Sequence, residues 1–370
     1  MAHDVAIIGA GVIGLLTARA LAARGRRVLL IDRDRSARQA SWASAGILLT
    51  STAGDDSAHA QLLDRSQRLY PELVEDLRER GGIDPEMTWE GHLIPAFGDR
   101  EAGQLKRFAD WERAQGLDTQ LLDRRALAEV EPCLADGSIV AAVMRPGGQI
   151  DNRRLCRSLE MVVERMGVER QSGAEAIGVL SEGDAVRGVR TVAGDFEAPT
   201  VVVAAGAWSG RVAGCLPQAP VVPQRGEILA IDQRAIGLRR VVMKSDDPYL
   251  VPRVDGRLVV GATRAYVGYD RTVTAGGVAE LLHEAQRMLP ALSGAPLVES
   301  WSGFRPVPTD GMPLLGPGAL EGLYFATGHG ANGIAPAPAS AELVAQLICG
   351  ESATIDAGPF DPRRFSDGRA

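Results

Sequence analysis

Apolar residues follow two different spacings near the start of the chain. Val5–Ile8 is a short continuous apolar run, and the glycine-rich turn Gly9–Gly14 follows it directly. Residues 15–23 then place apolar side chains at helical spacing, and a second apolar run, Val28–Ile31, ends in Asp32. This order of strand, glycine turn, helix, strand and acid predicts a βαβ unit that binds a dinucleotide.

Each residue type in this unit has a physical role. Gly9 allows the tight turn off the strand, Gly11 leaves the backbone open to a pyrophosphate, and Gly14 lets the helix pack closely on the strand. The helix N-terminus presents N–H groups and the positive end of its dipole to phosphates. Asp32 is placed to accept hydrogen bonds from ribose hydroxyls. The alternative is a βαβ unit that holds no nucleotide.

The hydrophobic pattern along the rest of the chain predicts further helices and strands. The predicted helices cover 58–80, 100–116, 124–130, 275–289 and about 338–349, and Asp151 caps another that runs to about Met166. The predicted strands cover 87–97, 138–145, 224–231, 249–253, 257–262, 301–306 and 323–327, with hairpin turns at Gly183-Asp184 and Asp255-Gly256. The buried run that starts at Val201 ends in a small-residue turn and is expected to return the chain to the first sheet, so that the first domain is discontinuous.

Composition and charge exclude several classes of protein. The chain has 370 residues, 45% of them hydrophobic and 24% charged, and a net charge of −7, which argues against a nucleic-acid partner. No apolar stretch approaches the ~20 residues that span a bilayer, and the N-terminus reads as a strand rather than a signal peptide. The four cysteines are scattered without a CxxC pair and the five histidines do not cluster, so we expect reduced thiols, a cytoplasmic location and no metal.

Four segments are more specific together than any one of them alone. They are Gly9–Gly14 with Asp32, Ala40–Leu48, Val201–Ser209, and Ser302–Pro306 with Gly328–Ile334. In this order they resemble the D-amino acid oxidase superfamily of FAD-dependent amine oxidases. The resemblance is greatest to the branch of glycine oxidases of the thiamine-pathway type and sarcosine oxidases, and it covers about residues 3–350.

The resemblance implies an α/β (α+β) fold with two domains. A Rossmann-like FAD-binding domain is expected from the discontinuous segments 1–84, 146–218 and 302–355. A substrate-binding domain built on a mixed, mainly antiparallel sheet is expected from 85–145 and 219–301, and residues 356–370 are expected to form a tail. A homo-oligomer is compatible with this organisation.

The resemblance also assigns residues to FAD. The ADP part would be held by Gly9, Gly11, Val12, Ile13, Gly14, Asp32 and Arg33, and the pyrophosphate and flavin ring would lie along Ser41, Ala43, Ser44, Ala45 and Gly46. Ala176 would contact adenine through its backbone, and Gly206 and Trp208 would lie near the ribityl phosphate. A helix N-terminus would approach the flavin through Gly328, Gly330, Ala331, Asn332, Gly333 and Ile334, with Arg305 close by. Segment 305–311 lacks the cysteine that tethers flavin in sarcosine oxidases, so non-covalent FAD is expected.

Two residues are candidates for binding a substrate carboxylate. Arg305 matches the family arginine that clamps the carboxylate, and a guanidinium can bind that group through two hydrogen bonds. Tyr249 lies on the predicted strand that presents a tyrosine to the same carboxylate in glycine oxidases. The alternatives are a surface ion pair for Arg305 and a half-buried strand residue for Tyr249. His329 is interpreted as a packing or turn residue, because flavin N5 carries the chemistry and no side chain is expected to be catalytic.

Two positions depart from the glycine oxidase pattern. The turn that reads Gly-His-x-Arg-Asn-Gly in those enzymes has Ala331 at the arginine position, and Arg264 stands where an apolar residue is common. Ala331 leaves room for a substrate longer than glycine. Arg264 would either supply replacement charge or face solvent.

The resulting hypothesis is an oxidase that deaminates glycine or, more specifically, an N-alkyl or N-carboxymethyl glycine. A small amine bearing a carboxylate would be oxidised to an imine that hydrolyses to glyoxylate and an amine, with O2 reduced to H2O2, in a biosynthetic or catabolic step. One alternative is a dehydrogenase of a D-amino acid or other amine that passes electrons to a quinone or a protein. Another is a domain that removes a carboxymethyl group from a tRNA base.

Overall fold

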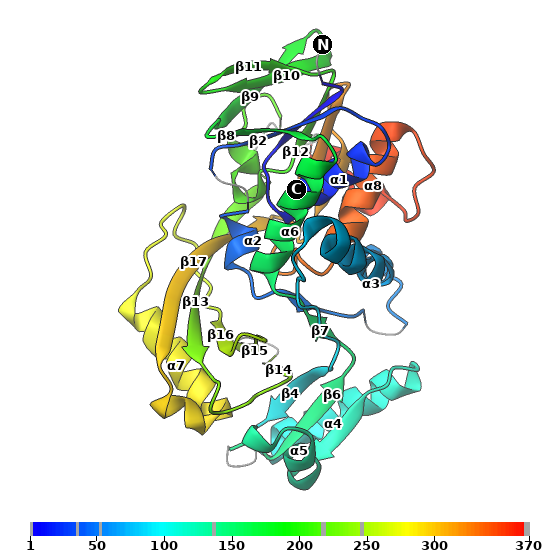
Figure 1. Ribbon diagram of the computed structural model, residues 1–370. Coiled ribbons are helices and arrows are strands. Elements are labelled where there is room, and N and C mark those ends of the chain that lie inside the picture. Colours follow the sequence, from blue (N-terminus) through cyan, green and yellow to red (C-terminus); the bar gives the residue numbers. More distant parts are fainter. Residues whose placement is uncertain are drawn as a thin grey trace.

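A six-stranded sheet forms the centre of one half of the protein. The computed structural model describes residues 3–34, 37–51, 54–134, 138–215, 220–244 and 248–365. The sheet has the order β18-β19-β12-β1-β2-β8, and its strands are Leu314–Pro317, Leu323–Thr327, Thr200–Val203, Val5–Ile8, Val28–Asp32 and Glu169–Ser172 (Figure 1). All neighbours are parallel except β18 and β19. The strand at 200–203 therefore returns to the first sheet, and the predicted discontinuous Rossmann-like arrangement is confirmed.

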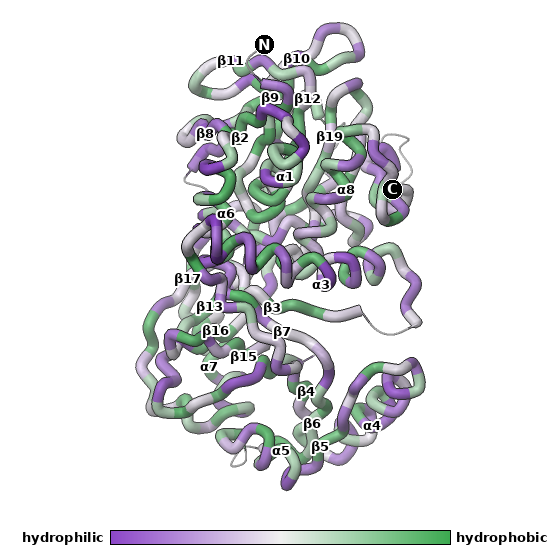
Figure 2. Tube along the Cα trace, turned by 45° about the vertical axis from the view of Figure 1, so that its right-hand side comes forward, coloured by the Kyte–Doolittle hydropathy of each residue, from purple (hydrophilic) through white to green (hydrophobic). Residues whose placement is uncertain are grey.

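Helices of this half bury their apolar faces in a common core. The core contains residues of β1, β2 and of four helices, α1 (Val12–Ala22), α3 (Ala58–Asp76), α6 (Asn152–Arg165) and α8 (Ala337–Cys349). In Figure 2, α3 alternates hydrophilic and hydrophobic residues along its length, as expected for a helix with one face in the core. The helix predicted at 58–80 is confirmed, with its last turn, Leu77–Gly81, widened into a π-helix.

Two smaller features of this half follow from local sequence. Asp151 Oδ1 accepts hydrogen bonds of 2.9 Å from the N–H groups of Arg153 and Arg154, so the predicted cap of α6 is confirmed. The turn at Gly183-Asp184 joins two antiparallel strands of a three-stranded sheet that contains β9 (Ala176–Glu182), β10 (Ala185–Thr191) and β11 (Gly194–Glu197).

The other half is built on a twisted eight-stranded sheet, as predicted mixed and mainly antiparallel. Its order is β17-β13-β16-β15-β14-β4-β6-β5, with strands Leu297–Pro308, Val221–Asp232, Arg257–Gly261, Tyr249–Pro252, Val241–Met243, His92–Ala96, Ala141–Arg145 and Gln120–Asp123. Only β14 and β4 are parallel neighbours. The helices of this half are α4 (Asp99–Ala114), α5 (Arg124–Val130) and α7 (Ala275–Met288), in the lower part of Figure 1.

Two strands are much longer than the pattern indicated. The predicted strands 224–231 and 301–306 are the middle parts of β13 and β17, which pair with each other from Val221↔Pro308 to Ile231↔Leu297. The pairing supplies hydrogen-bond partners for the backbone N–H and C=O groups of these two strands. Both strands therefore continue through polar residues that interrupt the apolar alternation. The predicted boundary between residues 301 and 302 lies inside β17.

The segment expected to form a tail instead packs against the six-stranded sheet as far as Phe365. Phe360 is completely buried in the core that contains α8, and Arg364 Nε donates a hydrogen bond of 2.6 Å to Asp310 Oδ2. Apolar burial and this hydrogen bond together fix a segment whose proline, glycine and charged residues are typical of a loop.

Candidate active site

A cavity of about 510 Å³ extends between the two large sheets. It begins at the carboxyl ends of β1, β2 and β12, where open parallel sheets bind their ligands, and reaches β13, β15 and β17 of the other sheet. Of the residues predicted to bind cofactor or substrate, Gly14 alone does not line this cavity. The others that line it are Gly9, Gly11, Val12, Ile13, Asp32, Arg33, Ser41, Ala43, Ser44, Ala45, Gly46, Ala176, Gly206, Trp208, Tyr249, Arg264, Arg305, Gly328, Gly330, Ala331, Asn332, Gly333 and Ile334.

The glycine turn after β1 has the geometry that its sequence predicts. Gly9 has φ +105°, and a Cβ there would lie 2.5 Å from the carbonyl oxygen of Ala204. A Cβ on Gly14 would lie 1.9 Å from the carbonyl oxygen of Gly9, so Gly14 allows helix and turn to pack from behind the cavity. Ser41 Oγ accepts a hydrogen bond of 2.9 Å from Val12 N–H, which joins the cavity-lining residues 41–46 to the start of α1.

Asp32 and Trp208 both line the cavity, and Arg33, the neighbour of Asp32, contacts the Trp208 ring. Asp32 accepts hydrogen bonds from Ala10 N–H (2.7 Å) and Asp34 N–H (2.9 Å). Burial raises the pKa of the Asp32 carboxyl, and these hydrogen bonds offset part of that rise. The guanidinium of Arg33 lies 3.7 Å from the centre of the Trp208 ring. Trp208 and Arg33 therefore form a cation–π contact directly after Asp32.

The turn before α8 is fixed by α3, a helix that the sequence analysis did not connect to the site. Tyr70 Oη donates a hydrogen bond of 2.5 Å to the carbonyl oxygen of Ile334, and Ser66 Oγ accepts one of 3.0 Å from Ala339 N–H. Tyr70 and Ser66 are four residues apart and so lie on one face of α3. They hold the N-terminal end of α8 next to the cavity.

His329 also lines the cavity, in the neutral form. Burial lowers its pKa to about 3. Ser340 Oγ donates to the carbonyl oxygen of Pro336 (2.9 Å), so it accepts the bond of 3.0 Å from His329 Nε2–H. This bond ties the turn to α8, which agrees with the interpretation of His329 as a packing or turn residue.

The candidate substrate-binding side chains converge on the short stretch 261–264. Arg305 Nη1 donates a hydrogen bond of 2.9 Å to the carbonyl oxygen of Thr263. A Cβ on Gly261 would lie 2.5 Å from Tyr249 Oη, and one on Gly226 would lie 2.7 Å from Arg305 Nη1. Gly226 and Gly261 were not predicted as site residues, and their lack of a side chain makes room for these two groups.

The two departures from the glycine oxidase pattern are both at the cavity surface. Ala331 and Arg264 line the cavity and are solvent-exposed, so Arg264 faces cavity and solvent together. Met243 and Lys244, at the end of β14, also line the cavity and were not predicted. Neither residue belongs to a motif, and only the placement of β14 beside β15 identifies them.

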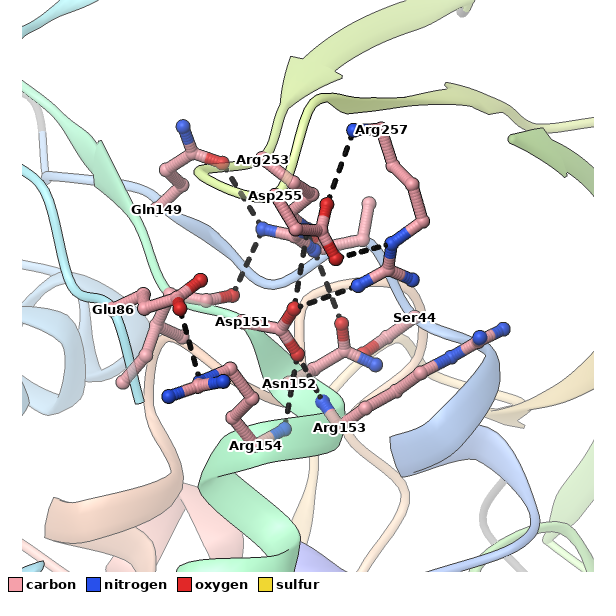
Figure 3. Close-up of polar contacts among 12 residues, drawn as sticks. Ser44, Glu86, Gln149, Asp151, Asn152, Arg153, Arg154, Arg253, Asp255 and Arg257 are labelled. Atoms are coloured by element: carbon pink, nitrogen blue, oxygen red, sulfur yellow. Dashed lines mark hydrogen bonds and ion pairs between the residues drawn. The ribbon is translucent and has the colours of Figure 1, made fainter. Parts of the chain in front are cut away.

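Three further side chains hold the cavity segment 41–46 from behind (Figure 3 shows Asn152 and Arg253). Asn152 Nδ2 donates to the carbonyl oxygens of Ser41 (2.7 Å) and Trp42 (2.9 Å). Trp301 Nε1 donates to that of Ala43 (3.1 Å), and Arg253 Nη2 donates to that of Ala45 (2.7 Å). The sequence contains no signal for these contacts, because each donor is more than 100 residues from its acceptor.

Comparison with known proteins agrees with this geometry. The model of the FAD dependent oxidoreductase family matches residues 4–347. The chain belongs to this family. Its βαβ unit, in which Gly9 and Gly11 line the cavity without side chains, fits FAD, and these residues would hold its ADP part.

Individual relatives in the family are similar over their whole length. A glycine oxidase of Pseudomonas aeruginosa is 36% identical over 367 residues, covering 98% of this chain and 99% of the relative. The crystal structure of glycine oxidase from Geobacillus kaustophilus is 34% identical with a TM-score of 0.90, covering 97% of this chain and 98% of that one. An iminodiacetate oxidase from Chelativorans is 28% identical with a TM-score of 0.85, covering 97% and 99%.

No helix in the part of the chain that the structure describes has the length and apolar character to cross a bilayer.

Proposed function

We propose that the protein oxidises the carbon–nitrogen bond of glycine or of an N-substituted glycine. The products are an imine, which water hydrolyses to glyoxylate and an amine, and hydrogen peroxide from O2. Bound FAD would accept the hydride, which carries the two electrons of the oxidation. The work of the protein is to orient the carboxylate, to hold the amine close to the flavin and to exclude water.

One observation carries the proposal: the convergence of Arg305 and Tyr249 in the cavity whose other end is the nucleotide cradle. Arg305 is half-buried and held by Thr263, so its guanidinium is oriented before a substrate binds. A guanidinium and a tyrosine hydroxyl that both lie over the stretch 261–263 suit a carboxylate, since both donate to oxygen. The similarity to glycine oxidases and to an iminodiacetate oxidase supports an amine that bears a carboxylate.

We further propose that the substrate is bulkier than glycine. Ala331 has a single methyl group at an exposed position of the cavity wall, so it leaves space next to Gly330 and Asn332. Arg264 lines the same cavity and adds positive charge near Arg305. An N-alkyl group would fill the space beside Ala331, and an N-carboxymethyl group would in addition be attracted by Arg264.

The test is a screen of peroxide release by the purified holoenzyme. Substrates are glycine, sarcosine, N-ethylglycine, N-propylglycine, iminodiacetate, D-alanine and D-proline. We expect the highest kcat/KM for an N-substituted glycine longer than sarcosine. The highest value for glycine or sarcosine would refute the bulkier substrate, and reaction with D-amino acids alone would refute the glycine class.

A second measurement separates an oxidase from a dehydrogenase. The flavin is first reduced with substrate under anaerobic conditions, and its reoxidation by air is followed by absorbance in a stopped-flow instrument. Reoxidation faster than turnover is expected for an oxidase. Slow reoxidation by air, together with fast reoxidation by a quinone, would replace O2 with another acceptor.

A further inference from the structure

Arg253 is an almost completely buried arginine that lies outside the cavity. Its side chain is 3% exposed, and burial lowers the pKa of its guanidinium. It follows directly after β15, whose first residue, Tyr249, lines the cavity. Burying a guanidinium is costly unless its N–H groups are satisfied, so the contacts of Arg253 indicate what it stabilises.

Four hydrogen bonds connect Arg253 to two segments of the other half of the protein (Figure 3). Nη1 donates to Gln149 Oε1 (3.0 Å) and to the carbonyl oxygen of Ile150 (3.1 Å). Nη2 donates to the carbonyl oxygen of Ala45 (2.7 Å) and to Asn152 Oδ1 (3.1 Å). The shortest of the four bonds therefore goes to the backbone of the cavity segment 41–46.

The bond to Ala45 fixes the direction of one peptide group. In a trans peptide the C=O and the N–H point to opposite sides, so Gly46 N–H is directed away from Arg253. Gly46 lines the cavity, and Arg253 does not. The N–H of this peptide therefore points away from Arg253 and belongs to a residue of the cavity wall, where FAD would be held.

The next peptide, Gly46–Ile47, is held by a second set of contacts. Gly46 has φ +62°, and a Cβ there would lie 2.0 Å from the carbonyl oxygen of Ile150. Ile150 N–H also donates a hydrogen bond of 2.9 Å to the carbonyl oxygen of Gly46. Arg253 also donates to the carbonyl oxygen of Ile150. One guanidinium therefore binds both backbone segments, at Ala45 and at Ile150, where they approach each other at Gly46.

We infer that Arg253 is a positioning residue that orients the Ala45–Gly46 peptide and thereby raises the electron affinity of bound FAD. Reduced flavin carries more negative charge than oxidised flavin. An N–H dipole that is already fixed stabilises this charge at no cost, whereas a mobile dipole would first have to reorient. Because Arg253 extends the strand that begins with Tyr249, it also sets the distance between the flavin segment and the substrate-binding wall. The inference rests on FAD binding and is independent of which substrate is oxidised.

The experiment compares Arg253→Met and Arg253→Lys with a matched control, Arg257→Gln. Arg257 belongs to the same cluster and pairs with Asp151 (3.2 Å) and Asp255 (2.7 Å), but among the described residues its side chain bonds to these two carboxylates and not to segment 41–46. The readouts are the reduction potential of the bound flavin and its Kd for sulfite, which adds to flavin and leaves it negatively charged. Neither readout uses an amine substrate, so a wrong substrate assignment leaves the result unaffected.

For Arg253→Met we expect sulfite to bind at least ~10-fold more weakly and the potential to fall by about 30 mV, the equivalent of that ratio for two electrons. Arg253→Lys, which keeps the positive charge and a single donor nitrogen, should lie between this variant and the wild type. Arg257→Gln should match the wild type in both readouts. A purely structural role would instead lower the melting temperature of the Arg253 variants without changing either flavin property.

Asn152→Ala keeps the arginine and provides a test if Arg253→Met does not fold. It removes one acceptor of Arg253 and the donor to the carbonyl oxygens of Ser41 and Trp42, so sulfite binding should weaken at least ~3-fold. An unchanged sulfite Kd and potential in the folded holo forms of Arg253→Lys and Asn152→Ala would overturn the inference. So would an equal shift in Arg257→Gln.

Discussion

The guanidinium of Arg305 is bound to the backbone of Thr263 through a hydrogen bond of 2.9 Å. Arg305 lies on β17, whereas Thr263 lies just beyond the end of β16, two strands away in the sheet. β13 lies between them, and its Gly226 has no side chain to obstruct the reach. This hydrogen bond orients the guanidinium, and Arg305 lines the cavity.

Removal of this guanidinium should weaken carboxylate substrates. Arg305→Ala should lower kcat/KM by at least ~30-fold, because truncating one partner of a buried charge pair costs about 2 kcal/mol or more. FAD content, measured by the ratio of flavin to protein absorbance, should stay at the wild-type value. Arg125→Ala, on the exposed outer face of α5, is the control and should not change kcat/KM. Wild-type efficiency in Arg305→Ala would remove Arg305 from the substrate site.

The size of the cavity at Ala331 predicts a change in substrate preference. Ala331→Arg should lower kcat/KM for the longest accepted N-alkylglycine by ~10-fold or more, since space for even one methylene group is worth that much. Glycine should be affected less, so the ratio of the two efficiencies is the measured quantity. Ala331→Ser, which adds one oxygen, should leave the ratio near the wild-type value. An equal loss for both substrates would show that the side chain at 331 does not limit substrate length.

FAD should be released completely when the protein is denatured. None of the four cysteines lines the cavity, and burial raises the pKa of Cys133 and Cys215 to about 12 and that of Cys156 further. Such thiols are protonated at neutral pH and unreactive. Precipitation with acid should leave all flavin absorbance in the supernatant. Flavin that remains in the pellet after washing would demonstrate a covalent bond.

Buried histidines should make the protein less stable in acid. His92 is fully buried and Nε2 bonds to Gly148 O (2.9 Å), and burial lowers its pKa from 6.5 to about 4. Below pH 6.5 the unfolded chain binds a proton that the folded chain does not, so the free energy of unfolding falls as pH falls towards 4. The expected slope for one such histidine is ~1.4 kcal/mol per pH unit.

His92→Gln isolates this contribution, because an amide N–H can replace the bond to Gly148 without titrating. The free energy of unfolding, measured with urea between pH 7 and pH 4.5, should then depend less steeply on pH than in the wild type, by ~1.4 kcal/mol per pH unit. An unchanged slope would mean that His92 is protonated in the folded protein. His329, with its pKa lowered to about 3, should account for a similar part of the slope that remains.

The sequence by itself determined those features that depend on neighbours along the chain. Residues 5–32 specify strand, turn, helix and strand, because apolar spacing and glycine placement act within a few residues. Asp151 specifies the start of α6 for the same reason, since its carboxylate reaches only the next N–H groups. The glycine turn at 328–333 and the position of Arg305 were identified by motif, and all of them lie at the cavity.

The tertiary structure alone decided which distant residues meet. The full lengths of β13 and β17 depend on their pairing, and the burial of Phe360 depends on a core formed by other segments. Arg253 is separated from Ala45 by 208 residues, so no local pattern marks it as a donor to that carbonyl oxygen. Folding brings the two together because a buried guanidinium requires acceptors and the backbone of the cavity wall provides them.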